Sequence, residues 1–309
     1  MEKLANNFTF APHFLNKANE SNDVFEQMKN TVTFFVTALL MATAQLKPFN
    51  PILGETFQAR INGMPIYFEQ VSHHPPISSF LLYGQQYKMI GKYEANASLH
   101  ANSCTVNIFG SPRVIYKNGA VIYCSIPCAN IGGTSFGQRT FNYEGKMFAY
   151  EPNHMLVCEV TFNPDKKGLV GGLFSKQANP NDYFSGGIYQ VTKECILNIQ
   201  KVGVLNKFGG INMKEDVVKE LCKASGIWHK YVDFGGVKYW EFGKCEAYEL
   251  EYERNPLPSD SIYREDLIAW KSEDVQKSQI VKEKMENIQR LDRKLRDKSQ
   301  KDKGKKHEH

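Results

Sequence analysis

Two adjacent histidines followed by two prolines are the residues of this chain best suited to chemistry. His73 and His74 stand in segment 69–76, which reads EQVSHHPP. Proline has no backbone N–H and disrupts the interior of a helix or a central strand, so this segment must end a strand or form a turn. Two imidazoles on a backbone stiffened in this way could bind an anion, ligate a metal ion or transfer protons near neutral pH.

The residues alone leave several interpretations of this pair open. Successive side chains of an extended chain point to opposite faces, which disfavours one metal ion bound by both histidines. A hydrolase would use His73 or His74 as a general base, and Ser72 and Glu69 are the nearby candidates for nucleophile and orienting carboxylate. This arrangement follows no established triad order. A surface turn with solvated histidines is the remaining alternative.

The elements that must position the pair are mainly strands. From about residue 55 to 200, short runs of β-branched and aromatic residues are separated by Gly, Asn and Pro. This spacing predicts an antiparallel meander that closes into a barrel or a sandwich. The dipeptides that predict hairpin turns are Asn62-Gly63, Asn118-Gly119 and Glu144-Gly145.

Helices are predicted near both ends of the chain. Residues 29–46 indicate a helix, and their apolar part is shorter than the roughly 20 residues of a membrane span, which favours a buried helix. Near the C-terminus, apolar residues recur at helical spacing and predict one long helix whose apolar face packs on the protein body. These residues are Val281, Met285, Ile288, Leu291 and Leu295. The lysine-rich tail from Lys298 is predicted to be disordered.

Composition narrows the class of protein. The 309 residues carry a net charge of +5, and 42% are hydrophobic and 23% charged, which is typical of a soluble globular protein able to enclose a cavity. Seven scattered cysteines, none at zinc spacing, favour reduced thiols in a cytosolic protein. The polar first residues predict no signal peptide. No P-loop, nucleophile elbow or dinucleotide fingerprint is visible.

Segment 69–76 resembles the signature of the oxysterol-binding protein family, which carries sterols and phosphoinositides. Two further elements stand in the family's order: KPFNPILGE at residues 47–55, and LPSDS at 257–261 with Arg264 and Asp266 after it. The resemblance extends from about Phe8 to Arg296 and suggests a short, stand-alone member. It implies a mainly β fold: a large antiparallel β-barrel around a hydrophobic lipid tunnel, with an N-terminal lid and helix and a C-terminal α-helical subdomain.

On this basis we expect a single lipid-binding domain with three parts. Residues 1–28 would form the lid and N-terminal segment, 29–255 the helix and barrel, and 256–309 the C-terminal helical segment and basic tail. The lid is expected in a small amphipathic patch near the N-terminus. Its residues are Phe8, Phe10, Phe14 and Leu15.

The resemblance also implies a head-group site for phosphatidylinositol 4-phosphate. Lys47 and Asn50 match the loop ligands of the family, and His73 and His74 match the pair that binds the 4-phosphate. Three more ligands are expected on the C-terminal helix. They are Lys282, Glu286 and Arg290.

The spacing of these C-terminal residues has two interpretations. Residues four apart share one helix face and rise about 6 Å per step. Lys282 and Arg290 could therefore contact separate parts of an inositol phosphate while Glu286 accepts hydrogen bonds from its hydroxyls. An ordinary ladder of ion pairs, each worth about 0.2–0.5 kcal/mol, would show the same spacing.

The implied function is non-vesicular lipid transfer, in which phosphatidylinositol 4-phosphate is extracted and exchanged for a sterol or phosphatidylserine between membranes. A hydrophobic tunnel removes the cost of about 0.8 kcal/mol for each CH₂ exposed to water. No bond is made or broken, so the protein is not expected to be an enzyme, and no cofactor or metal is expected. The alternative is a lipid sensor or scaffold that binds phosphoinositide or sterol without net transport.

Membrane lipids are thus the expected partners, through transient contact with anionic membranes that the modest positive charge favours. The lysines cluster without interleaved aromatic residues, which argues against nucleic acid as a partner. We expect a cytoplasmic monomer, peripheral at membrane surfaces or contact sites. The sequence does not predict which second lipid is carried or which membranes are connected.

Overall fold

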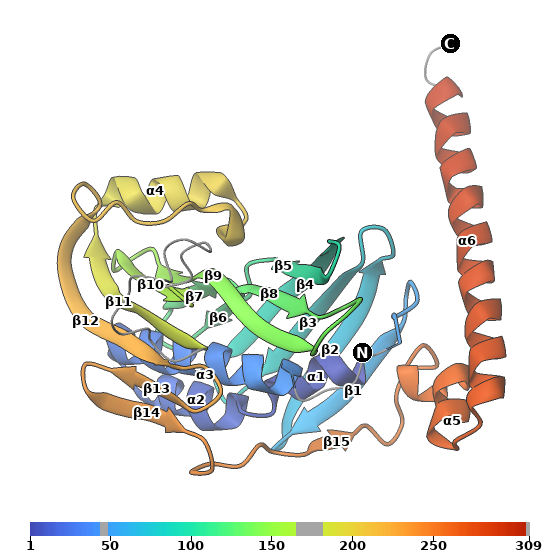
Figure 1. Cartoon of the computed structure of the whole chain (residues 1–309), viewed down its shortest axis with the longest axis horizontal. Helices are drawn as coiled ribbons and strands as arrows, with labels where there is room; N and C mark the ends of the chain where they lie inside the picture. The colour runs from blue at the N-terminus through green and yellow to red at the C-terminus, as the bar shows by residue number, and fades with distance from the viewer. Residues whose placement is uncertain (44–48, 165–181, 307–309) are drawn as a thin grey trace.

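The computed structural model describes residues 1–43, 49–164 and 182–306, and one large antiparallel sheet dominates it (Figure 1). The described residues hold fifteen strands: β1 (Thr56–Ile61), β2 (Met64–Ser72), β3 (Ile77–Tyr83), β4 (Lys88–Leu99), β5 (Ser103–Phe109), β6 (Arg113–Ile115), β7 (Val121–Cys124), β8 (Cys128–Gly132), β9 (Thr140–Glu151), β10 (Leu156–Phe162), β11 (Tyr183–Val191), β12 (Val217–Ile227), β13 (Tyr231–Phe234), β14 (Val237–Glu241) and β15 (Leu250–Tyr252). Along the sheet the order is β14-β13-β12-β11-β10-β9-β7-β6-β4-β3-β2-β1-β15, and β5 and β8 pair with each other between β4 and β9. The predicted mainly β, antiparallel fold is confirmed.

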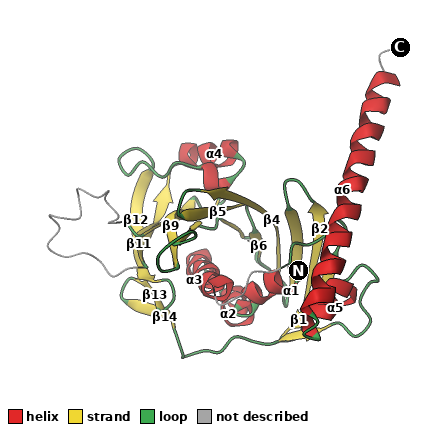
Figure 2. Cartoon of the chain, turned by 45° about the vertical axis from the view of Figure 1, so that its right-hand side comes forward, coloured by secondary structure: helices red, strands yellow, loops and turns green. Residues whose placement is uncertain are grey.

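The sheet curves round three N-terminal helices, as Figures 1 and 2 show. These are α1 (Glu2–Ala5), α2 (Ala11–Glu20) and α3 (Val24–Thr43). The two edge strands, β14 and β15, are joined by residues 242–249, which run past the N-terminal segment. The Tyr248 N–H donates to the Thr9 carbonyl at 3.0 Å. Residues 242–249 and the N-terminal segment therefore lie between the two edge strands of the curved sheet.

Two of the three predicted hairpin turns are confirmed. Asn62 and Gly63 both have positive φ and join β1 to β2, and Asn118-Gly119 joins β6 to β7. Glu144-Gly145 is not a turn, because β9 continues through it. Gly145, with a φ of +81°, marks the point where the pairing of β9 with β8 ends and its pairing with β10, on the other edge of β9, begins.

Helix α3 begins earlier than the sequence predicts. The expected start at residue 29 is wrong, because the Asp23 side chain accepts from the Phe25 N–H at 2.9 Å and caps the helix at Val24. The helix is buried over most of its surface, as expected for a core helix. Its threonines satisfy their hydroxyls within the helix, as when Thr31 donates to the Gln27 carbonyl at 2.6 Å. None of the described helices combines the length and apolar character needed to cross a membrane.

The predicted lid residues lie inside the curve of the sheet. Phe8, Phe10, Phe14 and Leu15 are at most 5% exposed and belong to the main hydrophobic core. Phe8 contacts Phe68 of β2, with the ring centroids 5.6 Å apart. The interior in which the sequence predicts a tunnel is therefore occupied by side chains of α1 to α3 in this structure.

Two helices follow β15 and stand beside the β1 side of the sheet (Figure 1). They are α5 (Glu265–Lys271) and α6 (Val275–Lys306). The Ser278 hydroxyl donates to the Asp266 carbonyl at 2.9 Å and joins the two helices. Ser278 and Gln289 are buried, at 2% and 8% exposure, and mark the side of α6 that meets the protein.

The predicted orientation of the α6 apolar stripe is wrong for its second half. Ile288, Leu291 and Leu295 are 50%, 59% and 65% exposed, whereas Val281 and Met285 are half-buried. Only the first half of α6 lies against the protein, and the helix then extends away from it (Figure 1). The hydrogen bond of Ser278 and the burial of Gln289 show that polar residues, and not the apolar spacing alone, face the protein.

Candidate functional site

The dihistidine turn, the loop before β1 and the first half of α6 enclose a pocket of about 220 Å³. Its lining residues are Phe49, Asn50, Ile52, His73, His74, Arg264, Lys282, Met285, Glu286, Gln289, Arg290 and Arg293. We call this the dihistidine pocket. Six of the seven predicted head-group residues line it. The seventh, Lys47, lies outside the described residues.

The two histidines lie in the turn between β2 and β3. Their ring centroids are 4.3 Å apart and the rings are tilted by 62°. The expectation that the imidazoles point to opposite faces is wrong, because residues 73–76 form a turn and not an extended chain. Both rings can therefore meet the same ligand.

Burial lowers the pKa of His73 below its ordinary value, and the positive charges of His74, Arg293 and Arg296 act in the same direction. Glu286 opposes them. The imidazole of His73 is thus mostly neutral at neutral pH when the pocket is empty. A bound phosphate would reverse the balance, because an anion close to the ring favours its protonated form.

The predicted ion-pair ladder is present on α6 and borders the pocket. Glu286 lies 4.0 Å from the Lys282 ammonium and 3.2 Å from the Arg290 guanidinium. The Arg290 side chain is 57% exposed and those of Lys282 and Glu286 are about one third exposed, so the ladder itself contributes little stability. The carboxylate holds both cations on the side of the helix that faces the histidines.

Arg264 lines the pocket and anchors the loop at Asn50 beside it. It was not among the predicted site residues. Its guanidinium donates to Glu55 at 2.7 Å and to the Asn50 carbonyl at 2.9 Å. It also forms two hydrogen bonds to Asp266, at 3.0 and 2.6 Å. All three charged side chains are at most 7% exposed. Burial disfavours the Arg264 charge, but these carboxylates hold its pKa above the ordinary value. The cluster ties the loop at Asn50 to the base of α5.

Gln289 and Arg293 are further lining residues that sequence reasoning missed. The Gln289 amide nitrogen is buried and has no hydrogen-bond partner among the described residues, so it remains available to a ligand. Arg293 adds a third cation from α6. A helical projection could have found them, because both lie three residues after a predicted ligand, Glu286 and Arg290 respectively.

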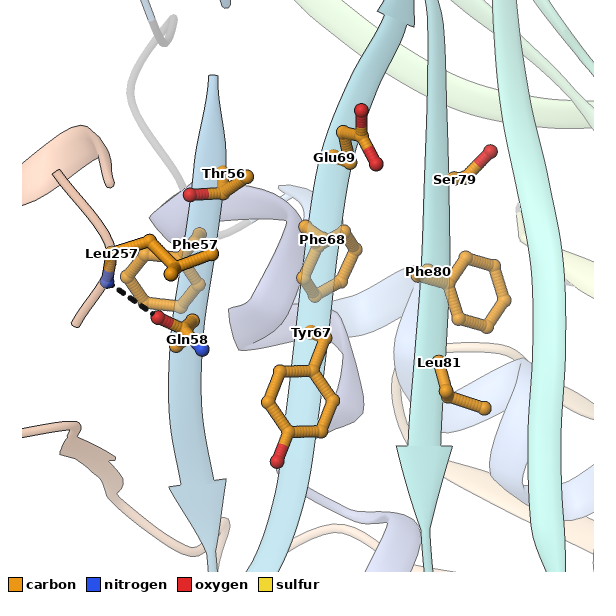
Figure 3. Close-up of a pocket in the computed structure, with 10 residues that line it drawn as sticks. All are labelled: Thr56, Phe57, Gln58, Tyr67, Phe68, Glu69, Ser79, Phe80, Leu81 and Leu257. Atoms are coloured by element: carbon orange, nitrogen blue, oxygen red, sulfur yellow. Dashed lines mark hydrogen bonds between the residues drawn. The ribbon is translucent and has the colours of Figure 1, made fainter. Parts of the chain in front are cut away.

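A second hollow, of about 290 Å³, lies across strands β1, β2 and β3 (Figure 3). Its lining includes the buried Phe57, Phe68 and Phe80, and Leu257 lies at one edge, where its N–H donates to the Gln58 side chain at 2.7 Å. It contains one charged side chain, that of Glu69. The hollow therefore lacks the positive charge that a phosphorylated ligand would need.

The chemistry available in the dihistidine pocket is recognition of an anion. It presents lysine, arginine and imidazole donors, and charge-assisted hydrogen bonds to phosphate are about twice as strong as neutral ones. Among the described residues no group of three His, Cys, Asp or Glu side chains is placed to hold a metal ion.

Comparison with known proteins agrees with this architecture. The family model described as oxysterol-binding protein matches residues 1–308. Oxysterol-binding protein 9 of Dictyostelium discoideum is 33% identical over 303 residues, which cover 96% of this chain and 68% of that protein. Oxysterol-binding protein-related protein 3B of Arabidopsis thaliana is 25% identical over 96% of this chain, and this chain spans 64% of its length.

Two solved structures share the fold. The Osh1 ORD domain in complex with cholesterol superposes with a TM-score of 0.70 at 18% identity, covering 97% of this chain and 73% of that one. The Osh3 ORD of Saccharomyces cerevisiae in complex with PI(4)P superposes with a TM-score of 0.67 at 20% identity, covering 96% and 77%. The family match over residues 1–308 and the 33% identity to the Dictyostelium protein show that the chain belongs to the oxysterol-binding protein family.

Proposed function

We propose that this protein is a lipid carrier that extracts phosphatidylinositol 4-phosphate from a membrane and exchanges it for a second lipid, a sterol or phosphatidylserine. One observation carries the proposal. The dihistidine turn and the Lys282–Glu286–Arg290 ladder, about 210 residues apart in the chain, line one pocket. Because a carrier makes and breaks no bond, the proposal assigns no catalytic residue.

The head group would enter the dihistidine pocket. Glu286 pairs with both Lys282 and Arg290, so its single negative charge balances only one of these two positive charges, and neither His73 nor His74 forms an ion pair among the described residues. A phosphate placed between the histidines and Arg290 would gain charge-assisted hydrogen bonds from both sides. Glu286 would then accept from inositol hydroxyls and keep Lys282 in place. Lys47 stays a proposed ligand.

The acyl chains would enter the interior that α1 to α3 now occupy. Transfer of a chain from a bilayer into an apolar interior avoids about 0.8 kcal/mol for each CH₂ otherwise exposed to water. Phe8, Phe10, Phe14 and Leu15 would be displaced from the core or repack against the lipid. The proposed lid would thus exchange contacts with the core for contacts with the cargo.

The relatives support both classes of cargo. The Osh3 ORD is solved with PI(4)P, and the Osh1 ORD is solved with cholesterol and with ergosterol. We infer by similarity that this chain binds lipids of these classes. We also propose that it acts in the cytoplasm as a monomer, at membrane surfaces or contact sites.

A transfer assay with two vesicle populations tests the proposal. Donor vesicles contain phosphatidylinositol 4-phosphate, and acceptor vesicles contain no competing lipid, a sterol or phosphatidylserine. A carrier moves the phosphoinositide, and an exchanger moves it faster when the acceptor holds the correct second lipid. Binding without any transfer would instead indicate a sensor or scaffold, the alternative function.

A further inference from the structure

The second half of α6 presents an apolar stripe that has no partner among the described residues. Ile288, Leu291 and Leu295 are 50%, 59% and 65% exposed, and their spacing of three and four places them on one helix face. At about 100° per residue, Leu291 and Leu295 lie roughly 200° and 240° round the helix from the buried Gln289. The stripe therefore points away from the protein and away from the dihistidine pocket.

Basic residues border one side of this stripe, and Asp292 lies at its other border. Segment 287–299 contains five basic residues and two acidic ones, which gives a net charge of +3. Lys294 and Lys298 are exposed and border the stripe. A helix with an apolar face and a basic polar face is typical of segments that lie in the interface of an anionic bilayer.

We propose that this face of α6 docks on an anionic bilayer, with Ile288, Leu291 and Leu295 inserted between the head groups. This inference rests on the proposed function, since a carrier must reach the membrane to load. The charge favours a bilayer over a second copy of the chain, because two α6 helices would bring like charges together. The stripe contains only three apolar residues, which suits shallow insertion and not a span.

Docking here has a consequence for loading. The first half of α6 lines the dihistidine pocket through Lys282, Met285 and Glu286, and the second half continues as the same helix. A bilayer bound to the outward face of the second half would therefore be separated from the pocket by about one helix diameter, roughly 10 Å. The same helix would recognise the membrane with one face and the lipid head group with the other.

Co-sedimentation with vesicles of phosphatidylcholine and a minority of phosphatidylserine, without phosphoinositide, tests the proposal. The variant Ile288→Gln/Leu291→Gln/Leu295→Gln removes the stripe and keeps residues that favour a helix. It should bind these vesicles at least tenfold more weakly than wild type. Lys294→Glu/Lys298→Glu should lose binding to the same vesicles, and added salt should weaken the wild type.

A matched control is Val218→Thr/Val237→Thr, which changes two side chains of similar exposure, 64% and 61%, on β12 and β14. It should bind vesicles like wild type. The proposal is overturned if wild type does not bind the vesicles, if the triple variant binds equally well, or if the triple variant converts a dimer into a monomer. Binding of water-soluble short-chain phosphatidylinositol 4-phosphate should persist in all variants, and its absence in wild type would count against the proposed function and not against the docking face.

Discussion

Replacing Arg264 with alanine should destabilise the protein strongly, because among the described residues Arg264 is the only side-chain cation of its buried cluster. The guanidinium makes four hydrogen bonds, to Glu55, to Asp266 twice and to the Asn50 carbonyl. The side chains of Glu55 and Asp266 are 1% and 0% exposed. Without Arg264, two carboxylates would remain buried. Their remaining partners would be the Ile52 and Leu267 N–H groups and the Met1 amino group, which lies 3.7 Å from Glu55.

Removing one partner of such a buried ion pair lowers the free energy of unfolding by about 3–5 kcal/mol. This loss is far larger than the stability that the intact pair adds over well-packed apolar residues in its place. For a chain of this length, with an unfolding entropy of about 2.1 cal/mol/K per residue, this corresponds to a fall of roughly 5–8 °C in Tm. Head-group affinity should fall as well, because the loop that carries Asn50 loses its anchor.

Thermal and urea unfolding of Arg264→Ala measure this loss. Arg60→Ala is the matched control, because Arg60 forms an exposed ion pair with Glu253 at 3.8 Å. The free energy of unfolding of this variant should fall by less than about 1 kcal/mol. If both variants lose the same small amount, the cluster does not hold the pocket together and the reasoning fails.

Three further predictions concern the pocket and the core. Arg290→Ala should weaken binding of phosphatidylinositol 4-phosphate roughly tenfold to a hundredfold or more, because one charge-assisted contact of about 1.5–3 kcal/mol is lost. Binding of a sterol or phosphatidylserine should be nearly unchanged. Equal effects on both lipids in a binding titration would exclude Arg290 from the site. Head-group affinity should rise as the pH falls from about 8 towards 6, because the lowered pKa of His73 leaves its imidazole neutral before phosphate binds, and phosphate binding then takes up a proton. A His73→Gln variant with the same pH profile would contradict this assignment. Phe8→Ala should destabilise the lipid-free protein by about 3–5 kcal/mol, since the ring is fully buried against Phe34, Phe68 and Phe80. A much smaller decrease in the free energy of unfolding, measured by chemical denaturation, would indicate that the lid does not pack in the core.

Local signals in the sequence predicted those features that depend on nearby residues. The paired prolines after His74 correctly placed the histidines in a turn at a strand end, and Asn62-Gly63 correctly predicted a hairpin. Glu144-Gly145 has the same composition as a turn, but the strand continues because β9 finds a new partner, β10, at Gly145. A dipeptide does not reveal such a change of partner, since the partner strand is distant in sequence.

The parts of the site that depend on tertiary contacts were less predictable. On α6 the residues that face the protein include the hydrogen-bonded Ser278 and the buried Gln289, two polar residues outside the apolar pattern. Arg264 contacts Glu55 across 209 residues of sequence, so no local spacing identifies their pairing. The resemblance to a family supplied Lys282, Glu286 and Arg290, whereas their spacing alone would equally fit the ion-pair ladder that the structure also contains.

Extraction of phosphatidylinositol 4-phosphate by His73→Ala/His74→Ala tests the central claim most directly, because this pair faces the α6 cations in the dihistidine pocket. The histidines are half-buried and exposed, respectively, so the variant should fold, with a circular dichroism spectrum and Tm close to wild type. His100→Ala, which removes an exposed histidine outside the pocket, serves as the control. Our account predicts that the pocket variant no longer extracts the phosphoinositide from vesicles while the control does. Extraction at the wild-type level by a folded pocket variant would contradict it.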